Sequence, residues 1–184
     1  MPVATFLTMW VVMMVAMMLP SLVPRLWRYR QAGFGLMTVL VAVGCFAVWT
    51  VFGMAAYPLV VALPRATPIA VGVVILLAGF LQFTAWKAHH LACCREAPAR
   101  GRAAWQEGLS LGLHCAKCNV GLMAILLVIG VADLRAMAVV AAAITVERLA
   151  PAGERVARAT GAIALVAGLF LIAIYTFRTG QPPR

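Results

Sequence analysis

This sequence predicts an all-α integral membrane protein, a bundle of about six transmembrane helices, and three observations support that fold class. Hydrophobic residues make up 65% of the 184 residues and charged residues only 11%, whereas soluble domains are about half apolar and about a quarter charged. The apolar residues fall in six runs. Short basic segments separate those runs. One membrane domain over residues 1–184 is therefore expected, with the lipid bilayer as its solvent.

Each predicted span has the composition of a membrane helix, and the six occupy residues 3–19, 34–63, 68–86, 109–131, 134–146 and 161–177. A membrane helix needs about 20 residues, so the short fifth run is expected to extend beyond its apolar limit. Pro20 and Pro24 are expected to follow the end of the first helix. Thr67, Asp133 and Thr160 are expected to cap the third, fifth and sixth helices.

Basic residues are divided unequally between the two sets of loops, and this division predicts the orientation. The loops after the odd-numbered spans hold Arg25, Arg28, Arg30, Lys87, Arg95, Arg100, Arg102, Arg148, Arg155 and Arg158. The opposite side holds Arg65, Arg135, Arg178 and Arg184. Because basic loops stay in the cytoplasm beside anionic headgroups, both termini are predicted outside the cytoplasm. The same placement accounts for the net charge of +10 without a nucleic-acid partner.

The strongest local signal for chemistry is the pair Cys115 and Cys118 in the fourth span. A C-x-x-C pair on a helix places both sulfurs on one face, so the two can share one ion or close a disulfide. His114, Lys117 and Asn119 surround the pair, and polar residues within a span are costly and mark function. The charge of Lys117 would favour the thiolate forms, unless its side chain extends to the interface.

A second cluster lies in the predicted cytoplasmic loop at residues 87–108. His90 and Cys94 are four residues apart, so they would share one face of a helix that continues from the third span. His89 and Cys93 form a parallel pair. Histidine and cysteine at this spacing are common metal ligands, so the loop is predicted to contribute to a metal site.

Methionines of the first span form two stripes along the predicted helix: Met9, Met13 and Met17, and beside them Met14 and Met18. Such stripes are commonly adaptable packing, but thioether sulfur is also a soft metal ligand. Cys45 stands alone in the second span and is expected to be a packing residue, because free cysteine behaves as a small hydrophobe.

The predicted topology brings these groups to one depth of the membrane. The first span runs inward and the fourth outward, so the methionines and the C-x-x-C pair both lie near the cytoplasmic headgroups. A single site is therefore predicted, with the ligands Cys115, Cys118, Cys94, His90, Met13, Met14, Met17 and Met18. Thiolate and thioether together select Cu(I), and the His–Cys pairing also suits Zn(II).

Four motifs together resemble the family of bacterial predicted metal-binding integral membrane proteins, a domain of unknown function, over nearly the whole chain. The first is Met-Met-Val-Ala-Met-Met-Leu-Pro-Ser at residues 13–21, and the last is Glu147 after a short span. The second resembles a Lys-x-x-Cys-Leu-x-x-Cys-Arg loop, matched by Lys87, Leu91, Cys94 and Arg95. The third resembles Gly-x-x-Cys-x-x-Cys followed by Leu-Met, matched by Gly112, Cys115, Cys118, Leu122 and Met123.

The chain departs from that family pattern at three positions. His90 stands where the first loop cysteine of the family would be, which keeps a metal ligand. Lys117 and Asn119 stand where a small residue and another cysteine are usual, which alters the affinity or the reactivity of the thiols. The resemblance implies metal binding and a bacterial cytoplasmic (inner) membrane.

The predicted function is soft-metal handling: the chain binds Cu(I) and exchanges it with a metal donor or acceptor protein. Two alternatives stay open. One is a membrane thiol–disulfide oxidoreductase using Cys115 and Cys118, although the reducing cytoplasm disfavours it. The other is a non-catalytic assembly subunit whose glycines, such as Gly72 and Gly79, allow close helix packing. An enzyme is not favoured, since five acidic residues leave little room for acid–base catalysis.

Overall fold

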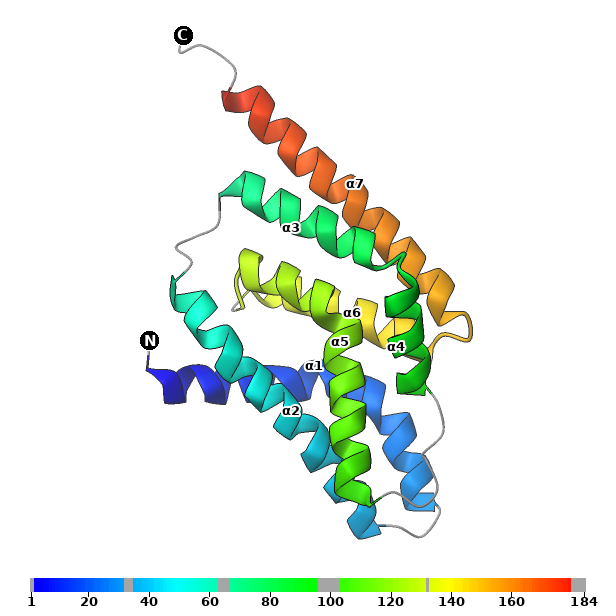
Figure 1. The fold of residues 1–184 in the computed structure, drawn as a ribbon. Helices are drawn as coiled ribbons and strands as arrows, with labels where there is room; N and C mark the ends of the chain where they lie inside the picture. The colour runs from blue at the N-terminus through cyan, green and yellow to red at the C-terminus, as the bar shows by residue number, and fades with distance from the viewer. Residues whose placement is uncertain (1, 32–34, 63–66, 96–102, 132, 180–184) are drawn as a thin grey trace.

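The computed structural model describes residues 2–31, 35–62, 67–95, 103–131 and 133–179 (Figure 1). Within these ranges lie α1 (Val3–Gln31), α2 (Gly35–Ala62), α3 (Pro68–Leu81), α4 (Ala85–Arg95), α5 (Ala104–Ile129), α6 (Leu134–Leu149) and α7 (Gly153–Thr179). The described residues contain helices and turns but no strand. The predicted all-α class is therefore confirmed.

Four helices are long and apolar enough to cross a membrane: α1 over Val3–Pro24, α2 over Gly35–Val61, α5 over Ala104–Ile129 and α7 over Gly153–Arg178. α3 and α4 pass the same test together, which raises the count to five if this bent pair is one span. α6 has 16 residues, fewer than the about 20 that a membrane helix needs. For the part of the chain that is described, length and composition thus support four or five spans where the sequence predicts about six.

The third predicted span is two helices rather than one. α3 ends at Leu81, α4 begins at Ala85, and the two are bent by 67°. The hydroxyl of Thr84 accepts a hydrogen bond from the Lys87 N–H at 3.3 Å, as an N-cap residue does, and so favours a new helix start. The expectation of one helix through residue 86 followed by a loop is wrong, because α4 continues to Arg95.

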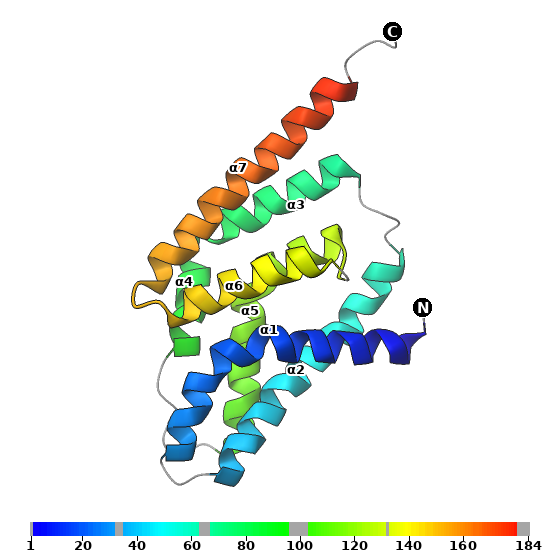
Figure 2. The ribbon, with the colours of Figure 1, turned by 180° about the vertical axis from the view of Figure 1, so that it is seen from behind.

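α1 continues through Pro20 and Pro24 to Gln31, so the two prolines do not end the first helix as predicted. Proline inside a helix removes a backbone hydrogen bond and bends the axis. Figure 2 shows the last turns of α1 directed away from its first part. This bend turns the C-terminal part of α1 along α2 instead of releasing it as a loop.

Two of the three predicted helix caps are confirmed. The Thr67 hydroxyl accepts from the Ala70 N–H at 3.3 Å, and the Asp133 carboxylate accepts from the backbone at the start of α6. The predicted cap by Thr160 is wrong, because α7 already begins at Gly153. Thr160 lies inside α7, where its hydroxyl donates to the Val156 carbonyl at 3.0 Å.

Glycines bring two helix pairs into close contact, as packing in membranes favours. A Cβ atom at Gly108 of α5 would lie 2.5 Å from the carbonyl oxygen of Val41 in α2. A Cβ atom at Gly79 of α3 would lie 2.9 Å from the carbonyl oxygen of Gly161 in α7. These contacts hold α2 against α5 and α3 against α7, and the second pair runs side by side in Figures 1 and 2.

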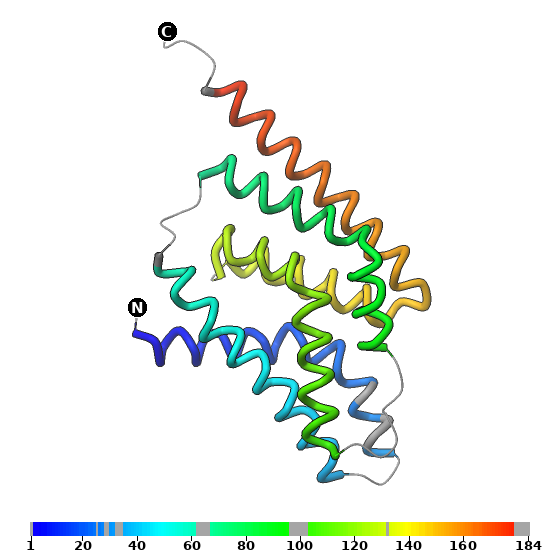
Figure 3. Tube along the Cα trace, viewed as in Figure 1, coloured from blue at the N-terminus to red at the C-terminus, as the bar shows by residue number. Residues whose placement is uncertain are grey.

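The buried core is rich in sulfur and lies where α1, α2, α4, α5 and α6 meet. Its sulfur-containing members are Met13, Met14, Met17, Met18, Cys45, Cys94, Cys115, Cys118 and Met123. α1 crosses behind α2 in the view of Figure 3, and α5 contacts α2, α3, α4 and α6. The central position of α5 therefore places its C-x-x-C pair within reach of several other helices.

Candidate metal centre

Four sulfur atoms from three helices meet in the core, and we call Met18, Cys94, Cys115 and Cys118 the thiol cluster. The Sγ atoms of Cys94 in α4 and Cys118 in α5 lie 3.9 Å apart. The Sγ of Cys115 in α5 lies 3.8 Å from the Sδ of Met18 in α1. All four side chains are buried. The sequence predicted that these residues share one site, and the structure brings their sulfur atoms together.

Cys115 lies in a shell of hydrogen-bond donors. The Trp49 Nε1–H donates to its Sγ at 3.3 Å, and the Asn119 amide lies 3.7 Å from the same sulfur. The thiol of Cys45 also hydrogen-bonds to Cys115. Donors directed at sulfur favour the thiolate, which is the form that binds metals. Cys45 is fully buried, as a packing residue would be, and in addition it contacts the thiol cluster.

Arg148 is the charged group of the thiol cluster. It lies in the last turn of α6 and is 9% exposed. Its Nη2 lies 3.6 Å from the Sγ of Cys118 and 3.8 Å from that of Cys94, and it also hydrogen-bonds to Cys115. Its Nη1 donates to the Ser21 hydroxyl at 3.3 Å. The expectation that Arg148 is a cytoplasmic loop charge is wrong, because α6 extends to Leu149 and buries it.

A second polar network ties α4 to α5 and α6. The Nζ of Lys87 lies 2.7 Å from the Oε2 of Glu147 and donates to the Cys118 carbonyl at 2.6 Å. The Gln82 amide donates to the other oxygen of Glu147 at 2.9 Å. Both charged side chains are almost fully buried, so Lys87 is not the exposed loop charge that was expected. This network neutralises one charge of each sign and holds the α3–α4 bend beside the thiol cluster.

The histidines form a separate group beside the thiol cluster. The Nδ1 atoms of His90 and His114 lie 2.9 Å apart, and the Nε2 of His89 lies 3.8 Å from the Cys93 sulfur. The ring of His90 contacts His89, His114 and Trp86. His90 and Cys94 are both buried on α4, as their spacing predicts, but they have different partners.

Lys117 does not supply the charge beside the thiols. Its side chain is exposed, whereas those of Cys115 and Cys118 on the same helix are buried. Arg148 occupies the position that the sequence analysis gave to Lys117 as the cation of the site. Met13, Met14 and Met17 are buried in the same core as Met18.

The spacing of the sulfurs decides what the thiol cluster can hold. Two sulfurs bound to one tetrahedral metal at about 2.3 Å each would lie about 3.8 Å apart. The Cys94–Cys118 and Cys115–Met18 separations match this value, so each pair can flank one ion. Among the described residues, no three or more His, Cys, Asp or Glu side chains already stand in the geometry of a metal site. The donor set fits a soft ion held by few ligands, with thioether in place of oxygen or nitrogen.

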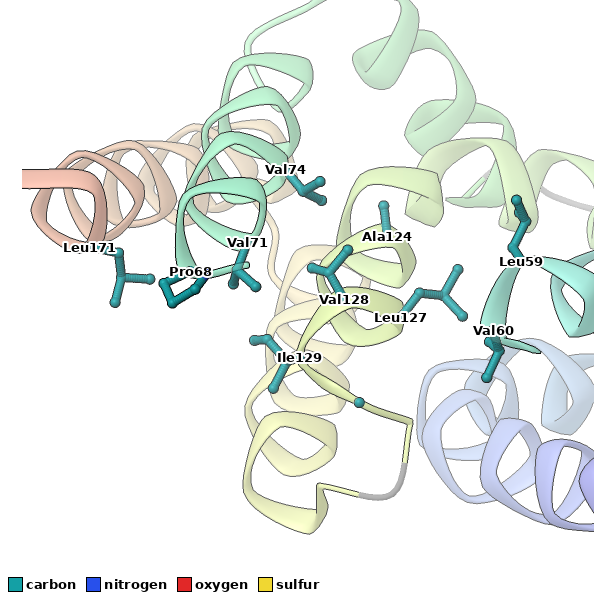
Figure 4. A pocket seen from close by; sticks show the side chains of 11 residues that line it. Leu59, Val60, Pro68, Val71, Val74, Ala124, Leu127, Val128, Ile129 and Leu171 are labelled. Atoms are coloured by element: carbon teal, nitrogen blue, oxygen red, sulfur yellow. The ribbon is translucent and has the colours of Figure 1, made fainter. Parts of the chain in front are cut away.

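A pocket of about 680 Å³ lies elsewhere, between the ends of α2, α3 and α5 and the side of α7 (Figure 4). Its walls are apolar, with Leu59, Val71, Leu127 and Leu171 among the lining residues. It contains no histidine, cysteine or methionine side chain. This pocket therefore offers no soft ligand for a metal.

Sequence reasoning does not find three residues that shape the site: Arg148, Trp49 and Gln82. Arg148 follows an apolar run together with other basic residues, so charge pattern alone assigns it to a loop. Trp49 and Gln82 carry a usable signal, because each places a hydrogen-bond donor within an apolar run. Trp49 also lies four residues after Cys45, which puts the two on one helix face.

Comparison with known proteins gives a family match. Neither a curated protein nor a solved structure matches the chain. The model of the PpoB2 family, described as copper chaperone, matches residues 7–171. That range covers most of the 184 residues and includes the thiol cluster, Arg148 and the Lys87–Glu147 pair. The chain therefore belongs to the PpoB2 copper chaperone family.

Proposed function

We propose that this protein binds one Cu(I) ion within the thiol cluster and passes it to an acceptor protein. The observation that carries the proposal is the meeting of Met18, Cys94, Cys115 and Cys118 from three separate helices. Thiolate and thioether are the soft ligands that favour Cu(I) over harder ions. Membership of a copper chaperone family supports the same metal.

The proposed ligands are the three cysteine sulfurs and the Met18 thioether. His90 is assigned to the neighbouring histidine group, since its ring contacts His89 and His114. Met13, Met14 and Met17 belong to the packing around the ion. Zn(II) is the less favoured cargo, because the Met18 thioether lies against Cys115, and thioether is a soft ligand that suits Cu(I) better than zinc.

The proposed setting is the bilayer of the bacterial cytoplasmic membrane. Large apolar side chains of α7 are exposed, among them Ile163, Val166, Phe170 and Phe177. A soluble monomer rarely exposes so much apolar surface on one helix, and lipid would cover it. Delivery is favoured over transport across the membrane, because the proposed ligands form one cluster near the middle of α5 and the pocket at the C-terminal end of α5 is apolar.

Copper stoichiometry tests the proposal. The protein is purified in detergent under reducing, oxygen-free conditions and titrated with Cu(I) against a competing Cu(I) chelator. We expect one Cu(I) per chain for the wild type and none for Cys115→Ser combined with Cys118→Ser. Cys93→Ser is the matched control, because Cys93 lies on α4 beside Cys94 but contacts His89 instead of the thiol cluster. Equal copper in the double variant and the control would rule out the site.

A thiol–disulfide oxidoreductase is the second candidate, and the 3.9 Å separation of the Cys94 and Cys118 sulfurs favours it. The reacting pair would then be Cys94 with Cys118, rather than the two cysteines of the C-x-x-C motif. Trapping with a thiol-alkylating reagent in cells separates the two functions. After an acid quench and denaturation with a Cu(I) chelator, copper delivery predicts that both buried thiols are alkylated. An oxidoreductase predicts a fraction of Cys94–Cys118 disulfide that resists alkylation under the same conditions.

A further inference from the structure

We propose that His90 of α4 and His114 of α5, which we call the histidine pair, form a second and weaker copper site, through which Cu(I) enters and leaves the thiol cluster. The inference rests on the proposed function and adds to it the route of the ion. The histidine pair offers nitrogen ligands, whereas the thiol cluster offers sulfur, so the two sites can be told apart by their chemistry.

All three histidines of the 184-residue chain gather in one place, although they come from two helices. The ring centroid of His90 lies 5.2 Å from that of His89 and 5.1 Å from that of His114. The rings of His89 and His114 are 6.5 Å apart. Polar side chains within a membrane domain are costly and mark function. Three imidazoles that meet in such a domain therefore indicate a binding role.

The histidine pair has the spacing of two ligands of one ion. Its Nδ1 atoms face each other at 2.9 Å. Two imidazole nitrogens bound to one tetrahedral metal at about 2.0–2.1 Å each would lie about 3.3 Å apart, so the rings need to separate by only about 0.4 Å. Imidazole is a good ligand for copper.

The histidine pair is expected to hold copper less tightly than the thiol cluster does. Its two nitrogens are fewer and harder ligands than the four sulfurs of the thiol cluster. In the described part of the chain no group of three or more His, Cys, Asp or Glu forms a metal site, so no third such ligand strengthens it. A strong Cu(I) chelator therefore keeps the histidine pair empty, and one Cu(I) per chain is still expected in the competition titration.

The position of the histidine pair joins the surface to the thiol cluster. His89 is exposed, His114 is half-buried and His90 is buried, so the three rings lead inward. His90 lies one helical turn before Cys94, and His114 directly precedes Cys115. Because the four sulfur ligands are buried, an arriving ion needs ligands nearer the surface before it reaches them. The histidine pair supplies those ligands.

X-ray absorption of copper tests whether the histidine pair binds. The protein is purified in detergent without a polyhistidine tag and loaded with one and then two equivalents of Cu(I), without oxygen and without a competing chelator. The first equivalent is expected to show sulfur ligands, and the second is expected to show the scattering of imidazole. His90→Asn combined with His114→Asn is expected to lose the imidazole signal. Trp86→Phe is the matched control, because Trp86 packs against the His90 ring but cannot bind copper through imidazole.

The rate of copper uptake tests whether the histidine pair lies on the route. Cu(I) is supplied as the complex of a weak coloured chelator, and its transfer to the protein is followed by the loss of colour. We expect the double histidine variant to take up the first equivalent about tenfold more slowly, the loss typical when a group that supports a metal site is removed. Its final occupancy by sulfur-bound copper is expected to equal that of the wild type.

Three results would overturn the inference: a second equivalent without imidazole ligands, an equal imidazole signal in the double histidine variant, or uptake by that variant at the wild-type rate. Loss of sulfur-bound copper in the double histidine variant would also overturn it, because the histidine pair would then be structural. If the first equivalent in the wild type is not bound by sulfur, the proposed function itself fails, whatever the histidine pair binds.

Discussion

Met18 is the methionine of α1 whose thioether contacts a thiol, at 3.8 Å from the Sγ of Cys115. The Met-Met-Leu-Pro-Ser stretch explains how it is held there. Pro20 lies inside the helix, and the hydroxyl of Ser21 donates to the Met18 carbonyl at 2.8 Å. The same hydroxyl accepts from Arg148, so one residue links the bend of α1 to the charge of the thiol cluster.

Replacing Met18 tests whether its thioether is a ligand. Met18→Leu is expected to lower the Cu(I) affinity by about tenfold, the loss typical when a contact that supports a bound metal is removed. Folding is expected to persist, because leucine and methionine have similar volumes and such exchanges usually cost less than about 1.5 kcal/mol. The competition titration with a Cu(I) chelator measures the change.

Met14→Leu is the matched control, because Met14 is a buried methionine of the same helix and belongs to the packing in our proposal. It is expected to keep the wild-type affinity. Equal losses in Met14→Leu and Met18→Leu would mean that the methionines act only by filling space.

The sequence alone predicts where the cysteine sulfurs of the site lie, but it does not predict which charged side chain lies beside them. The C-x-x-C spacing predicts that Cys115 and Cys118 share a face, and both are buried on α5. Which cation approaches them cannot be predicted in this way, since it depends on where α6 ends and how it packs. Arg148 and Lys117 both stand near polar residues in the sequence, yet packing buries the first and exposes the second.

At the scale of single elements, the apolar runs locate the helices and the caps locate some of their starts. The bend between α3 and α4 is not predictable from apolar content, because the run continues through Phe83. Its cause is local: the Thr84 cap and the Gln82 amide, which bonds Glu147 on α6. A local sequence pattern cannot predict a contact between two residues that are 65 positions apart.

Because α2 packs closely on α5, replacing glycine by alanine is expected to change the thermal midpoint very differently at two glycine positions. Gly108→Ala places a Cβ atom 2.5 Å from the Val41 carbonyl oxygen, so the two helices must separate. Overpacking of this kind costs about 1–3 kcal/mol. We expect the thermal midpoint followed by circular dichroism to fall by about 2 °C or more, together with Cu(I) occupancy.

Gly35→Ala is the matched control, since nothing lies within 4 Å of its Cβ position at the start of α2. Its midpoint is expected to stay the same or rise, because alanine favours the helix more than glycine does. A midpoint for Gly108→Ala equal to that of Gly35→Ala would show that the α2–α5 contact is not tight in solution.

At the scale of the whole molecule, the fold class follows from composition, but the number of spans does not. A run of apolar residues identifies a helix in either solvent, whereas spanning depends on its length and on breaks within it. α6 has only 16 residues and α3 is continued by a bent helix, so length and composition support four or five spans in the described ranges, against about six predicted. The apolar runs do predict that successive helices run in alternating directions, because a short segment connects each run to the next.

The arrangement of helix ends supports the proposed orientation and allows it to be tested. The beginning of α1 and the ends of α2, α5 and α7 lie toward one side of the molecule, left in Figure 1 and right in Figure 2. The thiol cluster lies near the middle of α5, where α4 packs beside α5 and α6 reaches Arg148. Most of the basic residues lie near the opposite ends of these helices, so that opposite side is proposed to face the cytoplasm.

Reporter fusions decide the orientation. Alkaline phosphatase, which is active only outside the cytoplasm, is expected to be active when fused after Arg184 and inactive when fused after residue 98. A green fluorescent protein fusion, which fluoresces in the cytoplasm, is expected to give the reverse pattern at both positions. The opposite result at both positions would reverse the proposed orientation of the helices. Copper would then be loaded from outside the cytoplasm. The proposed ligands of the thiol cluster would stay the same.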